Sequence, residues 1–174
     1  LETIKDEIIP VIFGLQSFSL TKKEIKIIKS NKIFGFIIFK RNILNLLQLQ
    51  TLITHIKSLS SIDPVIMIDH EGGRVNRFSN LFSQTRYTAR FFGDLYTKNK
   101  KFLLNEVSKF IKFNVKLFNY IGINTVAYPV SDLKYKKTHK IIGDRSFSKN
   151  PLIVNNLSKL FIKEYQKKGI NCIS

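Results

Sequence analysis

The stretch VIMIDHEGGRVNRF, residues 65–78, decides the fold of this chain. It begins with four apolar residues and stops abruptly at Asp69, after which come Glu71, two glycines, Arg74 and Arg77. A short apolar run bounded by polar residues is typical of a buried strand. Such a strand needs no carboxylate at its end in order to fold, and parallel α/β sheets and barrels hold their chemistry at the carboxyl ends of their strands. The stretch therefore predicts a buried strand that opens into a site.

Similar apolar runs recur on both sides of this stretch and alternate with helical patterns. They predict further buried strands at residues 10–14, 35–39, 123–128 and 170–173. Apolar spacing and end signals, such as the Thr21–Glu24 capping box and the Asn150–Pro151 start, predict the helices between them. These helices should run from Thr21 to about Ser30, from Leu46 to residues 58–61, over Leu103–Ile121 with Gly122 as a left-handed cap, and from Pro151 to Gly169.

Strict alternation of strand and helix predicts a parallel sheet with helix-covered faces. A (β/α)₈ barrel of this kind usually needs roughly 250 residues, whereas this chain has 174. We therefore expect an α/β fold of the TIM-barrel type with only about the first five βα units present. Residues 1–174 should form a single, incomplete domain.

Composition indicates a globular protein and raises a question about its partners. The chain is 44% hydrophobic, and 29 basic against 12 acidic residues give a net charge of +17. A nucleic-acid-binding domain is an alternative that rests on this charge alone. The lysines are scattered over residues 22–32, 98–116, 134–140 and 159–168, as on solvated helix faces. We accordingly expect neither a nucleic acid nor a membrane as partner.

The cysteine content and the apolar runs of the sequence indicate a cellular compartment. A single cysteine, Cys172, excludes an intrachain disulfide and suits a reducing compartment. No apolar run reaches the length of a membrane span, and residues 1–10 lack the layout of a signal peptide. The cytoplasm is the expected location.

The polar residues around the central stretch each have a structural alternative. Asp69 could cap its own turn, and one of the two arginines could pair inward with Asp69 or Glu71. Arg74 and Arg77 would point the same way if the loop were helical. In IIGDRSF, Arg145 could reach into a cleft or could pair with a nearby acid, for which Asp144 and Asp132 are the candidates.

Two other histidines, His55 and His139, have no partner at metal-ligand spacing. The sequence also has no phosphate-loop or dinucleotide signature. We expect no metal and no organic cofactor.

Four segments in order, GFIIFKRN, IMIDHEGGRVNRF, YPVSDL and IIGDRSFSKNP, closely resemble the N-terminal barrel domain of glycoside hydrolase family 3. Within the family they look like bacterial β-N-acetylhexosaminidases, which remove N-acetylglucosamine from cell-wall fragments during peptidoglycan recycling. The resemblance covers nearly the whole chain, and the D-x-E-G-G-R-V-x-R-F block is its most specific part.

The resemblance implies roles for individual residues. Asp69, Arg77 and Arg145 match the family's substrate-binding aspartate and two arginines. The signature loop of Glu71, Gly72, Gly73 and Arg74 should give mainly structural support. His70 stands where the family often has glutamine, and Ser131 replaces a residue that is usually apolar.

The implied reaction is retaining hydrolysis of a terminal β-linked N-acetylglucosamine, which needs a nucleophile and an acid/base group. In such relatives these groups follow a K-H-F-P-G-H-G block that would come after Ser174. We therefore expect no catalytic residue within residues 1–174, and association of this chain with a C-terminal half. Two alternatives are an inactive remnant and a sugar-binding module without turnover.

Overall fold

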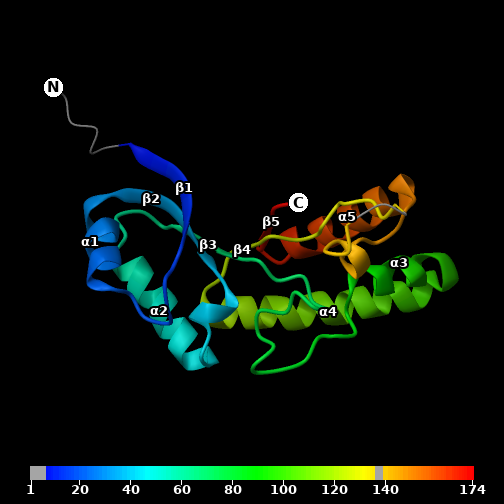
Figure 1. The fold of residues 1–174 in the computed structure, drawn as a ribbon, viewed down its shortest axis with the longest axis horizontal. Coiled ribbons are helices and arrows are strands. Elements are labelled where there is room, and N and C mark those ends of the chain that lie inside the picture. The colour runs from blue at the N-terminus through cyan, green and yellow to red at the C-terminus, as the bar shows by residue number, and fades with distance from the viewer. Residues whose placement is uncertain (1–6, 136–138) are drawn as a thin grey trace.

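The computed structural model describes residues 7–135 and 139–174, and their strands form one parallel five-stranded sheet (Figure 1). The strand order follows the chain, β1-β2-β3-β4-β5, and every neighbouring pair is parallel. This confirms the predicted α/β class with a parallel sheet. The strands are β1 (Ile8–Gly14), β2 (Lys32–Ile38), β3 (Val65–Ile68), β4 (Thr125–Val126) and β5 (Asn171–Cys172).

Four of the helices lie where the sequence predicts them. They are α1 (Lys22–Ser30), α2 (Leu46–Leu59), α4 (Lys100–Ile121) and α5 (Pro151–Gln166). Both halves of the Thr21–Glu24 capping box form, and the Asn150 side chain accepts the main-chain N–H of Leu152 at 2.9 Å. Gly122 ends α4 with φ 89°, a left-handed conformation that favours glycine. Local end signals therefore set the helix limits.

Helix α4 contacts both α2 and α5, and in Figure 1 it is the long horizontal helix below β3, β4 and α5. Ile38, Ile68 and Val126 are in register across three strands and are completely buried in the core. Ile37 and Met67 point to the opposite face of the sheet and are partly exposed. The core thus forms where β2, β3 and β4 meet the helices.

The first strand departs from its prediction. Residues 10–14 were expected to be buried, yet nearly every residue of β1 is exposed. Among the described residues β1 pairs only with β2, which makes it an edge strand, and its apolar residues are therefore covered on fewer sides. An apolar run by itself does not distinguish a central strand from an edge.

Helix α3 (Ala89–Lys98) was not predicted from the sequence. The Thr88 side chain caps it by accepting the Phe91 N–H at 3.0 Å. At Gly93 the helix comes so close to another segment that an added Cβ would lie 1.8 Å from the carbonyl oxygen of Phe147. Helix α3 therefore supports the backbone just after Arg145. Two short 3₁₀ turns, η2 (Lys40–Asn42) and η3 (Gly143–Arg145), complete the elements.

Candidate functional site

The loop after β3 folds back tightly on itself. The main-chain N–H of Glu71 donates to the Val75 carbonyl at 3.0 Å, and the Val75 N–H donates to Gly72 at 3.0 Å. Gly72 and Gly73 have φ values of 80° and 55°. A Cβ on Gly72 would lie 2.6 Å from the carbonyl oxygen of Tyr87. Both glycines are therefore required by the backbone, and the loop is a tight turn instead of a helix.

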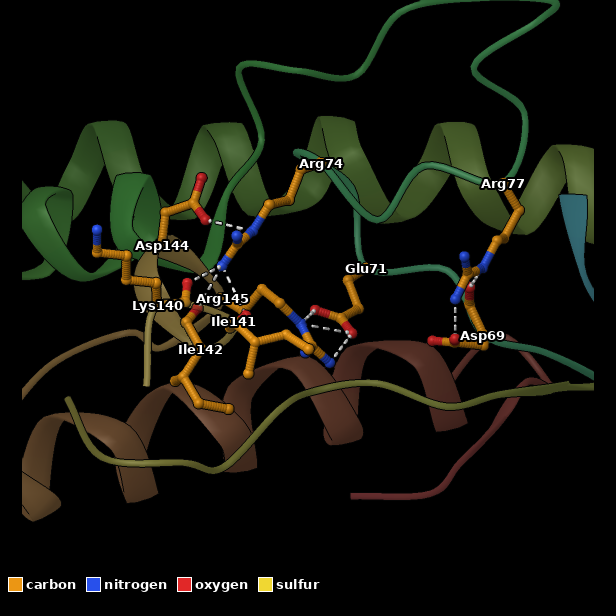
Figure 2. Close-up of polar contacts among 9 residues, drawn as sticks. All are labelled: Asp69, Glu71, Arg74, Arg77, Lys140, Ile141, Ile142, Asp144 and Arg145. Carbon is orange, nitrogen blue, oxygen red and sulfur yellow. Dashed lines mark hydrogen bonds and ion pairs between the residues drawn. The ribbon is translucent and has the colours of Figure 1, made fainter. Parts of the chain in front are cut away.

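Asp69 and Arg77 pair across the mouth of this loop (Figure 2). Arg77 donates from Nε to the main-chain oxygen of Asp69 at 2.6 Å, and its terminal nitrogen forms an ion pair with the Asp69 carboxylate. Each side chain is 26% exposed, so the pair also faces solvent. The guanidinium group lies 5.6 Å from the centre of the Phe39 ring. The alternative in which one arginine pairs with Asp69 is the one the structure shows.

Arg145 reaches the same loop from η3 and pairs with Glu71. Its Nε lies 3.1 and 2.9 Å from the two carboxylate oxygens, and a terminal nitrogen lies 2.6 Å from Oε1. The hydrogen bond to Glu71 raises the pKa of Arg145, although burial opposes this effect. The suggested pairing of Arg145 with Asp144 or Asp132 is wrong, because the 3₁₀ turn sends Asp144 and Arg145 to different partners.

Arg74 connects the two segments from the other side. Its Nε lies 2.9 Å from Asp144, and a terminal nitrogen donates to the carbonyls of Lys140, Ile141 and Ile142 at 3.1, 2.7 and 2.9 Å. Two arginine–acid pairs thus join the loop after β3 to the segment that carries Arg145, as Figure 2 shows. Arg74 and Arg77 contact different partners, because the loop between them is not helical.

His70 is buried next to the Asp69–Arg77 pair. In the sequence it stands out only because the family often has glutamine at this position. Its side chain is fully buried, and its Nδ1 accepts the main-chain N–H of Arg77 at 3.2 Å. Its Nε2 lies 2.8 Å from Oε1 of Gln84. Burial lowers the pKa of His70 to about 4. A buried histidine next to the pair was not predictable from spacing, since nothing local identifies its partners.

The Asp69–Arg77 pair is partly exposed at the surface of the molecule. A hollow of about 510 Å³ lies between α3 and residues 134–135 and 147–149, with Arg90, Lys134 and Lys149 among its lining residues. Neither Asp69 nor Arg77 lines this hollow, so we place the site by its side-chain geometry. In the described part of the chain no group of three or more His, Cys, Asp or Glu side chains could hold a metal ion. No helix among the described residues has the length and apolarity to cross a bilayer.

Comparison with known proteins identifies similar chains. The profile of the glycosyl hydrolase family 3 N-terminal domain matches residues 7–173. A curated β-hexosaminidase of Thioalkalivibrio sulfidiphilus is 30% identical over 165 residues, which cover 94% of this chain and 47% of that protein. One from Neisseria gonorrhoeae is 33% identical over 166 residues, covering 92% and 44%.

Solved structures are similar over the same span. The crystal structure of native NagZ from Neisseria gonorrhoeae matches with a TM-score of 0.84 and 31% identity, covering 94% of this chain and 47% of that one. A second structure of that protein holds N-trifluoroacetyl-D-glucosamine. The chain thus spans about half the length of the relatives it matches.

Proposed function

The chain belongs to glycosyl hydrolase family 3, and from this premise we propose that the whole protein hydrolyses terminal β-linked N-acetylglucosamine with retention of configuration. The observation that carries the proposal is that Asp69 and Arg77 pair in the loop after β3, and that Arg145, from a distant segment, pairs with Glu71 of the same loop (Figure 2). Asp69, Arg77 and Arg145 are the residues that the family resemblance assigns to the substrate.

The chemistry of these groups suits a sugar. A carboxylate accepts through about four lone-pair positions, and Arg77 engages one oxygen of Asp69, so the carboxylate can also accept from sugar hydroxyls. Arg145 uses Nε and one terminal nitrogen on Glu71. Its other terminal nitrogen, which has no hydrogen-bond partner among the described residues, is left to donate to a hydroxyl or an acetamido oxygen. Asp69 would thus accept hydrogen bonds from the same sugar to which Arg145 donates one.

Bond cleavage with retention needs two further groups. A carboxylate nucleophile forms a glycosyl-enzyme, and an acid/base group protonates the leaving oxygen and then activates water. We propose that both come from outside residues 1–174, and that this chain supplies the sugar-holding part. The proposed substrate is a peptidoglycan-derived fragment, and the proposed location is the cytoplasm.

The same premise supports a proposal for the fold. Residues 1–174 would be part of one (β/α)₈ barrel domain, in which further βα units pair with the outer edges of β5 and β1. The support is that β1 and β5 each have one strand partner among the described residues. A C-terminal half, in the same chain or as a separate one, would then complete the domain.

The test compares binding with turnover. Saturation-transfer NMR with N-acetylglucosamine should detect binding to residues 1–174, and Asp69→Ala should abolish it. Asp94→Ala, which removes an exposed aspartate of α3, should leave binding unchanged. Residues 1–174 should release no chromophore from 4-nitrophenyl N-acetyl-β-glucosaminide, whereas the whole protein should.

Two results would contradict the proposal. Turnover by residues 1–174 that Asp69→Ala abolishes would show that the bond-breaking groups lie inside this chain. Absence of sugar binding by well-folded residues 1–174 would show that this part of the protein does not hold the substrate.

A further inference from the structure

We propose that His70 is a positioning residue: its neutral imidazole holds the main chain of Arg77, and thereby sets the geometry of the Asp69–Arg77 pair. The inference rests on the proposed function in that this pair is taken to hold the sugar. His70 itself is completely buried and does not face solvent. It would therefore act on the substrate only through Arg77.

The hydrogen bonds determine which nitrogen of His70 carries the proton. The Arg77 main-chain N–H can only donate, so Nδ1 must accept and must be unprotonated. Nε2 then carries the hydrogen and donates to Oε1 of Gln84 at 2.8 Å. A proton on Nδ1 would make this nitrogen a donor that faces a second donor, the Arg77 N–H. The imidazole is thus required in one tautomer, and its low pKa keeps that neutral form at ordinary pH.

The Gln84 amide is fixed in turn by a chain of buried partners. Its Nε2 donates to Oδ1 of Asn114 in α4 at 2.8 Å, and Asn114 donates from Nδ2 to the hydroxyl oxygen of Tyr165 in α5 at 3.2 Å. Gln84, Asn114 and Tyr165 are each at most 5% exposed. Donors and acceptors alternate in one direction from Arg77 to Tyr165, so turning either amide around would break two bonds.

Aromatic packing holds the imidazole ring in place. His70 meets Phe78 edge to face at 5.3 Å between ring centres, and Phe118 in the same manner at 6.1 Å. The ring is therefore fixed on its faces by packing and at both nitrogens by hydrogen bonds. Arg77, whose N–H it holds, is oriented so that the side chain reaches back to Asp69.

The test compares two substitutions of His70. The leucine of His70→Leu is apolar and leaves the Arg77 N–H and Oε1 of Gln84 without the partner that His70 gives them. Gln in His70→Gln offers one acceptor and one donor on a planar group, so it can take over both bonds. We expect His70→Leu to raise the Kd for N-acetylglucosamine about tenfold, the value of one hydrogen bond, and to speed hydrogen exchange at the Arg77 amide. We expect His70→Gln to keep the Kd and the exchange rate of the Arg77 amide at the values of the unsubstituted protein.

A matched control separates positioning from general loss of stability. Ile28→Ala truncates a buried residue of α1 that takes no part in the hydrogen-bonded chain. It should lower the melting temperature while leaving Arg77 amide exchange and the sugar Kd unchanged. In the unsubstituted protein, a long-range ¹H–¹⁵N spectrum should show His70 Nδ1 without a proton.

A proton on Nδ1 would overturn the proposal, as would folded His70→Leu protein with unchanged Arg77 exchange. If the tautomer and exchange results hold but the unsubstituted chain binds no sugar, the proposed function fails and the positioning of Arg77 stands. If sugar binds with equal Kd in His70→Leu, the sugar site stands and the positioning role fails.

Discussion

Glu71 and Arg145 lie 74 positions apart in the sequence and share three hydrogen bonds. The Glu71 side chain is 6% exposed and that of Arg145 is 26% exposed. Removing one partner of such a pair leaves the other charge poorly solvated, which costs far more than losing a surface ion pair. This contact is therefore one of the two arginine–acid pairs that join the loop after β3 to the segment before α5.

Glu71→Gln should lower the free energy of unfolding by about 2–3 kcal/mol, because the neutral amide leaves Arg145 without its counter-charge. Urea unfolding at neutral pH measures this. The control is Glu164→Gln, which removes a partly exposed partner of the exposed Lys167 at 2.7 Å and should cost less than about 1 kcal/mol. Equal losses in the two variants would mean that the Glu71–Arg145 pair does not tie the segments together.

His70 should make stability depend on pH. Chiefly through burial, its pKa falls from 6.5 to about 4 on folding, so the unfolded chain takes up a proton at higher pH than the folded chain does. The stability that the neutral imidazole contributes is complete above pH 6.5, declines as the pH falls, and is lost below about pH 4. The full difference is about 3 kcal/mol.

His70→Gln removes this titration and keeps the other ionisable groups. Between pH 6.5 and 4 the unsubstituted protein should therefore lose up to about 3 kcal/mol more stability than the variant. Urea unfolding curves of both proteins across this range check the difference. Parallel curves would show that His70 titrates alike in the folded and unfolded chains.

At the scale of elements, α3 depends on its contact with the segment after Arg145. Gly93 allows that contact, since a Cβ there would lie 1.8 Å from Phe147 O and 3.3 Å from Phe147 Cα. Both are backbone atoms, which cannot move aside as a flexible side chain would. The helix and the chain segment therefore have to separate if residue 93 carries a side chain.

Gly93→Ala should destabilise the protein by about 3 kcal/mol or more, because overpacking against backbone exceeds the roughly 1 kcal/mol that alanine contributes to a helix. Thermal unfolding measures the loss, and faster exchange at the Arg145 amide should accompany it. Asp94→Ala, on the exposed side of the same helix, should stay within about 0.5 kcal/mol. A more stable Gly93→Ala protein would contradict the close contact.

The sequence predicts the ends of helices better than the burial of strands, because capping signals are local in the sequence and burial is not. The capping signals at Thr21, Asn150 and Gly122 act within one turn, so they predict the helix ends correctly. Helix α3 carries comparable signals, a Thr88 cap and apolar Phe91, Phe92 and Leu95, and these could have revealed it. β1 was predicted as a strand correctly but as a buried one wrongly, because burial depends on neighbours that the strand's own residues do not encode.

At the scale of the whole molecule, the sheet has two open edges among the described residues. β1 pairs with β2 alone and β5 with β4 alone. Apolar side chains stand exposed along these edges, including Ile8 at 50%, Val11 at 39%, Phe13 at 44% and Ile173 at 49%. Exposed apolar edge strands are templates for pairing with another chain. In the proposed barrel they would pair with further strands.

Residues 1–174 alone should self-associate as concentration rises, and Val11→Lys should reduce this, since a charge on an edge strand opposes pairing. Sedimentation velocity over a concentration series measures it. Leu104→Lys changes an apolar residue of α4 that is 56% exposed, away from both edges, and should leave association unchanged. Equal effects of the two lysines would place the association surface elsewhere.

The sequence by itself determined the alternation of strands and helices, the parallel sheet and the position of Asp69 at the end of β3. Apolar periodicity and capping act over a few residues, so they can be read from the chain directly. Only the tertiary structure decided that Arg145 pairs with Glu71, that Arg74 holds Asp144, and that His70 is buried against Arg77. These contacts form because folding brings distant segments together, and burial there favours whichever charged and polar partners can satisfy each other.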